Sequence, residues 1–253
     1  MISADVLRDQ ESVVALTGAG ISLAAGIPIY RAPDGSFLDE DNELWLYRDY
    51  FDAATAQWYP KFWELHDTIR AASPTRGHRA LSAMVKAGIV DHIVTQNVDG
   101  LDLLAGTDKE RVSEVHGIER RLSCTNFEEC GFEVLTEDWL IEKGKSAPPT
   151  CPHDDQPLKP DFNLYGERYA RRDVVEDGIR GKRVLEAADA LLVVGTSLSI
   201  DPWRRIVFDK IEEKKPVVIV NPNPKPVDEL ARFLILRSTA DEGLSLLQEQ
   251  LVS

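Results

Sequence analysis

Cysteine, positive charge and long apolar runs are all scarce in this sequence. Cysteine occurs only three times in 253 residues. No run of about 18 apolar residues occurs, which is the length that a spanning helix needs, so we expect no membrane segment. Residues 1–5 lack the basic region followed by an apolar one that marks a secretory signal. Repeats and low-complexity tracts are absent as well, and we expect a cytoplasmic globular enzyme.

The shortage of positive charge is large. Lys and Arg number 29 against 43 for Asp and Glu, which gives a formal net charge of −14 at pH 7. A chain this acidic is disfavoured for non-specific binding to nucleic acid or anionic membranes, so we expect neither partner. A lysine-bearing peptide is compatible with the charge.

The few cysteines lie close together. Cys124, Cys130 and Cys151 all fall within residues 124–151. An odd number of cysteines argues against a disulfide framework. Clustered thiols are typical of a metal site, because thiolate sulfur is a preferred zinc ligand.

Apolar runs and segments of helical pattern alternate along the chain. The apolar runs cover residues 12–16, 89–94, 190–194 and 216–220, and the helical segments cover residues 75–87, 169–188, 203–213 and 239–251. Continuous β-branched runs are typical of strands that are covered on both faces. The alternation predicts an α/β fold with a doubly wound, Rossmann-like parallel sheet.

Every apolar run ends in glycine or in polar side chains. The four ends are Thr17-Gly18-Ala19-Gly20, Thr95-Gln96-Asn97-Val98-Asp99, Gly195-Thr196-Ser197 and Asn221. Ligands of open α/β sheets bind at the carboxyl ends of the strands, so these ends predict one shared crevice for a nucleotide-like ligand. Glycine lets the backbone approach a diphosphate. The turn at Gly18 nevertheless lacks the third glycine of the usual dinucleotide fingerprint, and by itself it is equally typical of a tight strand-to-helix turn.

Two regions interrupt the alternation. Residues 31–73 are rich in aromatic side chains, and we expect a helical or mobile segment that packs over the sheet. Residues 121–167 hold the cysteines and several prolines, and we expect a loop-rich, zinc-ribbon-like insert. Both would form a small domain beside a discontinuous sheet domain of residues 1–30, 74–120 and 168–253, within one catalytic domain that spans 1–253.

Motifs in a fixed order give the chain a family resemblance. They are Gly18-Ala19-Gly20-Ile21-Ser22, Gly26-Ile27-Pro28, Tyr30-Arg31, Gln96-Asn97-Val98-Asp99, His116-Gly117, Tyr165-Gly166-Glu167 and Gly195-Thr196-Ser197. Together they resemble the sirtuin family of NAD-dependent protein-lysine deacylases over nearly the whole chain. The resemblance implies cleavage of the bond between nicotinamide and ribose in NAD, transfer of an acyl group from lysine to ADP-ribose, and release of nicotinamide.

The resemblance also implies residue roles. His116 would act as general base on a ribose hydroxyl, a task that suits histidine near neutral pH, and Asn97 would orient the ribose and a water. Tyr30 would shield the reacting centre. The expected cofactor-binding residues are Gly18, Ala19, Gly20, Tyr30, Arg31, Gln96, Asn97, Val98, Asp99, His116, Gly195, Thr196, Ser197, Asn221, Ala240 and Asp241. Asn163, Leu164, Tyr165, Gly166 and Glu167 would pair with an extended acyl-lysine peptide.

Three departures from the family pattern lie near the expected cofactor and acyl pockets. Ile29 stands where the family has aspartate, Asp102 where it has histidine, and Asn163 where it has an apolar residue. Two alternatives therefore stay open beside deacylation. One is an NAD-dependent protein ADP-ribosyltransferase or NAD hydrolase, and the other is a non-catalytic NAD-binding module.

The cysteine pattern departs from the family as well. The family has two Cys-x-x-Cys pairs, whereas Cys124 and Cys130 are farther apart here and Asp154 takes the position of the fourth cysteine. Zinc also accepts carboxylate and imidazole, so Asp154 or His153 can complete a structural zinc site. An insert that folds without metal is the alternative.

Overall fold

A six-stranded parallel sheet forms the larger part of the protein. The computed structural model describes residues 5–29, 44–167, 172–223 and 234–252. The strand order is β3-β2-β1-β7-β8-β9, and all neighbouring strands run parallel. The strands are β1 (Val13–Thr17), β2 (His92–Thr95), β3 (Val112–Glu114), β7 (Ala190–Val194), β8 (Val217–Val220) and β9 (Leu234–Leu236). The four central strands are those that the apolar runs predict.

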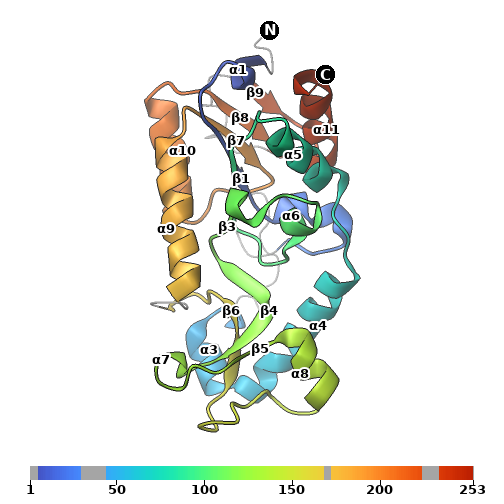
Figure 1. Ribbon diagram of the computed structural model, residues 1–253, viewed down its shortest axis with the longest axis vertical. Coiled ribbons are helices and arrows are strands. Elements are labelled where there is room, and N and C mark those ends of the chain that lie inside the picture. Colours follow the sequence, from blue (N-terminus) through green and yellow to red (C-terminus); the bar gives the residue numbers. More distant parts are fainter. Residues whose placement is uncertain (1–4, 30–43, 168–171, 224–233, 253) are drawn as a thin grey trace.

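Helices cover both faces of this sheet (Figure 1). One face carries α9 (Arg172–Ala187) and α10 (Trp203–Glu212), and the other carries α5 (Arg76–Lys86) and α11 (Ala240–Leu251). Val13 and Ala15 of β1 pack in the cluster with α5 and α11, whereas Val14 and Leu16 pack in the cluster with α10. Successive side chains of a strand point to opposite faces, so a strand buried on both sides must be apolar throughout. The doubly wound fold is confirmed.

The shorter elements of the large sheet region lie in its connections. They are α1 (Asp5–Arg8), η1 (Ala19–Ile21), η2 (Leu23–Ala25), α6 (Leu101–Leu104) and η3 (Lys109–Arg111). The Arg8 guanidinium donates to the Leu251 carbonyl at 2.9 Å, so the first and last helices meet at one end of the molecule (Figure 1).

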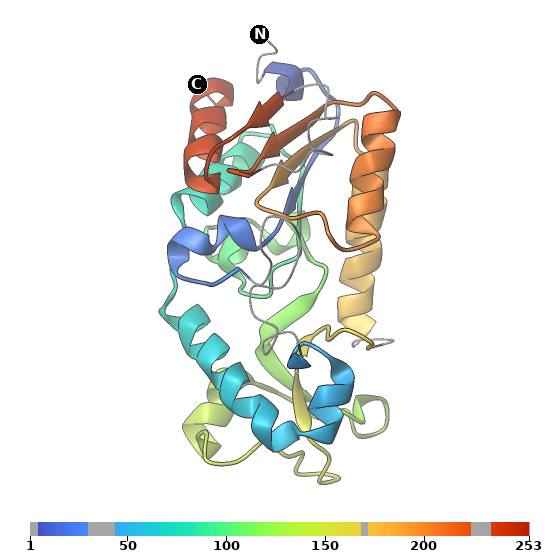
Figure 2. The same ribbon diagram turned by 180° about the vertical axis from the view of Figure 1, so that it is seen from behind.

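A small antiparallel sheet stands at the opposite end of the molecule (Figure 2). Its order is β5-β4-β6, and it is joined by four helices. These elements are β4 (Gly117–Cys124), β5 (Glu133–Leu135), β6 (Leu158–Phe162), α3 (Arg48–Ala53), α4 (Thr55–Ala71), α7 (Phe127–Cys130) and α8 (Thr136–Lys143). The insert is more regular than the expected loop. Pro160 fits in β6 because that strand is an edge, where a missing N–H leaves no ladder bond broken.

The described part of the aromatic segment, residues 44–73, packs on the small sheet and not over the large one. Trp58 stacks on Phe62 with ring centroids 5.5 Å apart, and its indole N–H donates to the Trp45 carbonyl at 2.6 Å. The same cluster contains Leu122 of β4 and Leu158 of β6. These rings therefore form the core of the second module. In the ranges that the structure describes, no helix combines the length and apolar character that crossing a bilayer requires.

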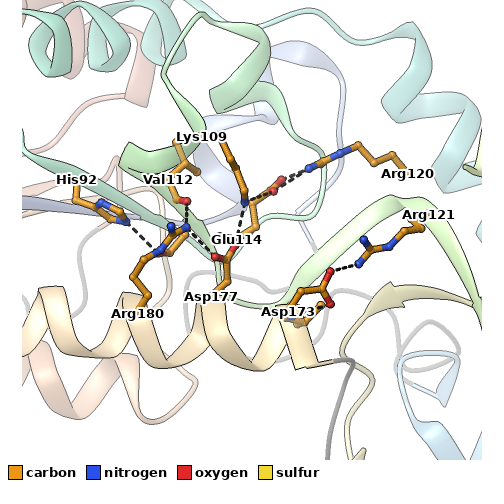
Figure 3. A network of polar contacts seen from close by, with 11 residues as sticks. His92, Lys109, Val112, Glu114, Arg120, Arg121, Asp173, Asp177 and Arg180 are labelled. Carbon is orange, nitrogen blue, oxygen red and sulfur yellow. Dashed lines mark hydrogen bonds and ion pairs between the residues drawn. The ribbon is translucent and has the colours of Figure 1, made fainter. Parts of the chain in front are cut away.

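A polar network ties α9 to the two strands that approach it (Figure 3). Asp177 of α9 accepts from Lys109 at 2.9 Å, and Lys109 also contacts the buried Glu114 at 3.0 Å. Arg120 of β4 donates two hydrogen bonds to the Glu114 carboxylate, both at 2.8 Å. Arg180 of α9 donates to the hydroxyl of Ser113 at 3.0 Å. Helix α9, strand β3 and the start of β4 are therefore joined by charge as well as by packing.

Candidate active site

A glycine turn follows β1 and touches the end of β7. A Cβ at Gly20 would come within 2.7 Å of the Gly195 Cα, and a Cβ at Gly18 within 2.8 Å of the Thr196 Cβ. The Gly20 N–H donates to the Gly195 carbonyl at 2.8 Å, and the Gly18 N–H donates to the Val194 carbonyl at 3.0 Å. A side chain larger than hydrogen would push the two strand ends apart. Ala19, between the glycines, starts the single turn η1.

Side-chain amides join the remaining strand ends to this turn. Gln96 donates to the Thr196 hydroxyl at 3.0 Å, and Asn221 donates to the Thr196 carbonyl at 3.2 Å. Asn97 donates to the Gly18 carbonyl at 3.2 Å. Hydrogen bonds thus link the ends of β1, β2 and β7 to one another and the end of β8 to that of β7. The sheet-edge argument predicts this convergence, because parallel strands end at the same edge.

Asp99 is held by two donors beside the turn. Its carboxylate accepts from the Ser22 hydroxyl at 2.7 Å and from the Leu101 N–H at 2.9 Å. Burial raises the pKa of Asp99, and these two hydrogen bonds offset part of the rise. Ser22 is fully buried and also accepts from Asn97 at 3.3 Å. Ser22 is missing from the predicted site residues, although its place in the glycine motif was a signal that could have included it.

His116 lies directly before β4 with both ring nitrogens engaged. Its Nδ1 lies 3.0 Å from the Gln96 carbonyl, and its Nε2 accepts from the Trp203 indole N–H at 3.1 Å. A carbonyl only accepts and an indole only donates, so the ring is neutral with its proton on Nδ1. Burial lowers the pKa of His116 to about 4. Trp203 is missing from the predicted site, because the sequence marks it only as the start of a helix.

The turn after His116 requires glycine. Gly117 has φ +89°, and a Cβ there would come 2.0 Å from the Asp161 carbonyl oxygen. The chain can therefore pass from His116 into β4 only with a bare backbone at this position. This contact also brings His116 beside β6, since the Asn163 N–H donates to the His116 carbonyl at 2.8 Å.

The predicted peptide-binding segment is anchored along one side. The Tyr165 N–H donates to the Leu46 carbonyl at 2.7 Å, and the Tyr165 carbonyl accepts from the Arg48 N–H at 2.9 Å. The Tyr47 and Tyr165 rings lie 5.4 Å apart, and Leu164 is buried. Gly166 turns the chain back with φ +80°. The segment is therefore extended and rigidly attached to the small module.

A carboxylate beneath this segment fixes its shape. Glu167 accepts from the Leu164 N–H at 3.0 Å and pairs with Arg48 at 3.0 Å and with Lys159 at 3.3 Å. Lys159 is buried and also donates to the Phe162 carbonyl at 2.6 Å. Burial lowers the pKa of Lys159, and the charge of Glu167 opposes that shift.

The three cysteines and Asp154 form one cluster. One ligand atom from each of Cys124, Cys130, Cys151 and Asp154 lies within 4.8 Å of all the others. Burial raises the pKa of the Cys124 thiol well above the usual range and raises the pKa of the Cys151 thiol as well, so a nearby cation would favour the ionised sulfurs. Three thiols with one carboxylate fit a tetrahedral zinc ion. Of the two candidates for the fourth ligand, the geometry groups Asp154 with the thiols, while the exposed His153 packs edge-on against Phe132.

The remaining predicted residues are spread around the site. Val98 accepts from the Glu119 N–H through its carbonyl at 3.1 Å, and Ser197 accepts from the Ser199 hydroxyl at 3.0 Å. Asp241, which follows the buried Ala240 in α11, accepts from the Gly77 N–H of α5 at 2.7 Å. Asp241 therefore accepts from a free N–H in the first turn of α5. Tyr30 and Arg31 lie outside the described residues.

Fold and site together define an α/β protein of the nucleotide-binding kind, with a neutral histidine at the edge of its sheet. The Sir2 family model matches residues 18–202, and the chain belongs to that family. It is 34% identical over 253 residues to an NAD-dependent protein deacetylase of Haloarcula marismortui, with 98% of this chain and 93% of that protein covered. It is 33% identical over 230 residues to an NAD-dependent protein deacylase of Aeropyrum pernix, with 88% and 85% covered.

Solved structures give the same family. A Sir2 protein with a deacetylated p53 peptide and 3'-O-acetyl ADP-ribose superposes with a TM-score of 0.84 at 25% identity, covering 98% of this chain and 96% of that one. A Sir2 homologue in complex with NAD superposes with a TM-score of 0.83 at 25% identity, covering 98% and 92%.

Proposed function

We propose that the protein is an NAD-dependent protein-lysine deacylase that transfers an acyl group from a modified lysine to ADP-ribose and releases nicotinamide. Membership of the Sir2 family and the activities named for the relatives support this function. The observation that carries it is the state of His116. Its neutral ring presents Nε2 as a proton acceptor at the sheet edge, beside the Gln96 backbone and the Asn163 segment.

NAD supplies the nicotinamide leaving group and the ribose carbon that receives the acyl oxygen. Gly18, Ala19 and Gly20 with Gly195, Thr196 and Ser197 hold the diphosphate and the adenosine side. Gln96, Asn97, Val98 and Asp99 hold the nicotinamide side. Tyr30, Arg31, Asn221, Ala240 and Asp241 complete the cofactor set. The close glycine packing supports the first group, because it lets the backbones of the two strand ends meet and form one edge for the diphosphate.

His116 acts as the general base. Its Nδ1–H is anchored to the Gln96 carbonyl, which orients Nε2 to take the proton of a ribose hydroxyl. A pKa of about 4 leaves the ring unprotonated at neutral pH, so no proton has to be removed before the reaction. Asn97 orients the ribose from the neighbouring strand end.

The peptide substrate lies along residues 163–167. An extended segment captures a peptide through backbone hydrogen bonds and so accepts many sequences. Asn163 is bonded to the backbone of His116, so the acyl-lysine and the base are positioned by the same strand junction.

Cys124, Cys130, Cys151 and Asp154 would hold a zinc ion that stabilises the fold. Strand β4 runs from Gly117, next to His116, to Cys124 in the cluster. At about 3.3 Å per residue, its length separates the cluster from His116 by roughly 20 Å. An ion at that distance cannot act on the ribose. Its ligands would instead join β4, α7 and the turn before β6.

The three proposed zinc ligands among the cysteines form no disulfide, which supports a cytoplasmic location, where cysteines stay reduced. The catalytic domain consists of a discontinuous sheet domain, residues 1–30, 74–120 and 168–253, and a small domain of residues 31–73 and 121–167. The site lies between the strand ends of the sheet domain and residues 163–167 of the small domain, where the two domains join.

Incubation with an acyl-lysine peptide panel and NAD tests the function. The protein should release nicotinamide and free lysine in equal amounts. His116→Ala should lose about 10²–10⁴-fold in rate, the usual contribution of a general base. His153→Ala, at an exposed histidine outside the site, is the matched control and should keep full activity.

Other outcomes would assign another activity. ADP-ribose attached to protein would indicate a transferase, and free ADP-ribose with intact acyl-lysine would indicate an NAD hydrolase. NAD binding without nicotinamide release on any acyl peptide would indicate a non-catalytic module and would contradict the proposal.

A further inference from the structure

The indole of Trp203 occupies the nitrogen of His116 that the proposed reaction uses. Trp203 is the first residue of α10, and it packs at 5% exposure in the apolar cluster between α10 and the large sheet. From there its Nε1–H donates to the His116 Nε2 at 3.1 Å, with the two ring centroids 6.4 Å apart. The helix packing therefore brings a hydrogen-bond donor to the base from the side opposite the Gln96 carbonyl.

These two contacts are compatible with only one protonation state. The Gln96 carbonyl accepts, so Nδ1 carries a hydrogen, and the indole donates, so Nε2 carries none. A protonated ring would turn an N–H toward the indole N–H, and neither could accept. The Trp203 contact is therefore lost when His116 takes a second proton.

We propose that Trp203 is a positioning residue that holds His116 in its neutral Nδ1–H form and keeps the Nε2 lone pair unprotonated until a ribose hydroxyl replaces the indole. The role rests on the proposed function of His116 as general base. It goes beyond that function, because it gives α10, through Trp203, a part in setting the protonation state of the His116 Nε2. After His116 has accepted the hydroxyl proton, the indole has no acceptor left and favours the return of the ring to the neutral form.

Few charged groups near His116 affect its pKa besides the contact with Trp203. Burial lowers the pKa of His116, and the Gln96 carbonyl acts in the opposite direction. On α10 and its N-terminal turn, the charged neighbours of Trp203 are Asp201 and Arg204, which pair with each other at 3.2 Å on the surface. Among the residues that the structure describes, no charged side chain contributes to the shift of His116. Removal of the indole N–H should therefore have a visible effect on the titration of His116.

Trp203→Phe removes the N–H and keeps a planar ring. One neutral hydrogen bond to the unprotonated form corresponds to about 0.5–1 pH unit, so the acid limb of kcat/KM for nicotinamide release should move up by that amount. The sign follows because the indole stabilises the neutral ring, and its loss favours protonation. Trp139→Phe is the matched control, since the Trp139 indole N–H has no partner among the described residues and lies on α8. Its pH profile should overlay that of the wild type.

A second measurement keeps the test decisive if Trp203→Phe turns over too slowly. The His116 ring can be titrated by NMR in both proteins without NAD, and the variant should titrate at the higher pH. Profiles and titrations that coincide, or a shift to lower pH in the variant, would overturn the role of Trp203. If His116→Ala retains activity, the proposed function fails. If His116→Ala is inactive and Trp203→Phe is unshifted, only the inference about Trp203 fails.

Discussion

Burial changes the acid–base behaviour of single residues around this site, and Asp102 is the clearest case after His116. Asp102 is buried in α6, and its Oδ1 has no hydrogen-bond partner among the described residues. Burial and the nearby charge of Asp99 raise its pKa to about 7, although a hydrogen bond from Thr95 opposes the rise. The family pattern has histidine at this position, so the departure places beside the site a carboxyl group whose pKa burial raises toward neutral pH.

Asp102→Asn should make stability less dependent on pH. The unfolded chain ionises Asp102 near pH 4 and the folded chain near pH 7, so the wild type loses stability as the pH rises through this window. Between about pH 5 and about pH 8 the loss from this group is about 2–3 kcal/mol. The variant should lack that loss, which urea unfolding at the two pH values measures.

The control for this prediction is Asp108→Asn, which removes an exposed carboxylate from the following loop. It should leave the pH dependence of the wild type intact. A wild type and an Asp102→Asn variant whose unfolding free energies run parallel from about pH 5 to about pH 8 would contradict the assigned pKa.

At the level of elements, the proposed peptide-binding segment, residues 163–167, depends on a buried charge group beneath it. Glu167 pairs with Lys159 and Arg48 and also accepts the Leu164 N–H. Glu167→Gln would leave Lys159 buried without its counter-charge, so we expect a loss of about 3 kcal/mol in the free energy of unfolding. Since the segment loses its support, KM for the peptide should rise while KM for NAD changes little.

A double variant separates this effect from general damage. Lys159→Met combined with Glu167→Gln removes both charges and should recover most of the lost stability. Glu186→Gln removes one partner of an exposed pair with Lys182 and should change stability by less than about 0.5 kcal/mol. A double variant no more stable than Glu167→Gln alone would show that the pairing is not the cause.

Zinc retention by the cluster of three cysteines should depend on Asp154. Asp154→Cys supplies a fourth thiolate, a stronger zinc ligand than carboxylate, so the ion should be lost more slowly to a chelator than in the wild type. Asp154→Ala should lose it faster, as a colorimetric chelator assay would measure. His153→Ala should release zinc at the wild-type rate. Faster release from His153→Ala would make the imidazole the fourth ligand.

At the scale of the whole molecule, the Glu114 network couples the two modules (Figure 3). Burial alone would raise the pKa of Glu114, but hydrogen bonds and charge from Arg120 and Lys109 hold it below its ordinary value. Arg120 also lies 3.0 Å from where a Cβ of Gly100 would be, in the loop that follows Asp99. The start of β4 is thus connected to helix α9 and to the active-site loop at once.

Glu114→Gln should destabilise the protein at neutral pH by about 1–3 kcal/mol, because two charged donors lose a carboxylate acceptor. The lowered pKa gives the sign of the pH dependence. The contribution of Glu114 is present above its unfolded pKa and is lost as the pH falls through its lower folded pKa. Urea unfolding should therefore show a gap between wild type and variant that closes on acidification. A gap that stays constant would assign the effect to packing.

The sequence pattern predicts the regular helices well and the short strands poorly. Helices α5, α10 and α11 begin and end within one residue of the predicted 75–87, 203–213 and 239–251. The edge strands β3 and β9 have three residues each, too few for a periodic signal. Strand β2 starts three residues later than the apolar run, because the Ile89 and Val90 N–H groups bond back to the Met84 carbonyl at the end of α5.

Some residues of the candidate site can be predicted from the sequence and others cannot. Polar residues at the ends of apolar runs are visible in the sequence because buried strands have no other need for them. As that pattern predicts, Gln96 contacts Thr196, while Asn97 and Asp99 contact Gly18 and Ser22 of the glycine turn. Ser22 was within reach of the same reasoning. Trp203 was not, since an aromatic residue at the start of an amphipathic helix is indistinguishable from a core residue until the helix is docked.

The sequence by itself determined the sheet, the edge at which a nucleotide would bind and the family of the chain. These follow from local periodicity and from short motifs, which do not depend on how distant segments pack. Only the tertiary structure decided that the indole of Trp203 meets Nε2 of His116, that Asp154 and not His153 joins the thiols, and that Glu167 supports the peptide segment. Each of these joins residues far apart in the chain, and a contact made by close packing has no local pattern that could encode it.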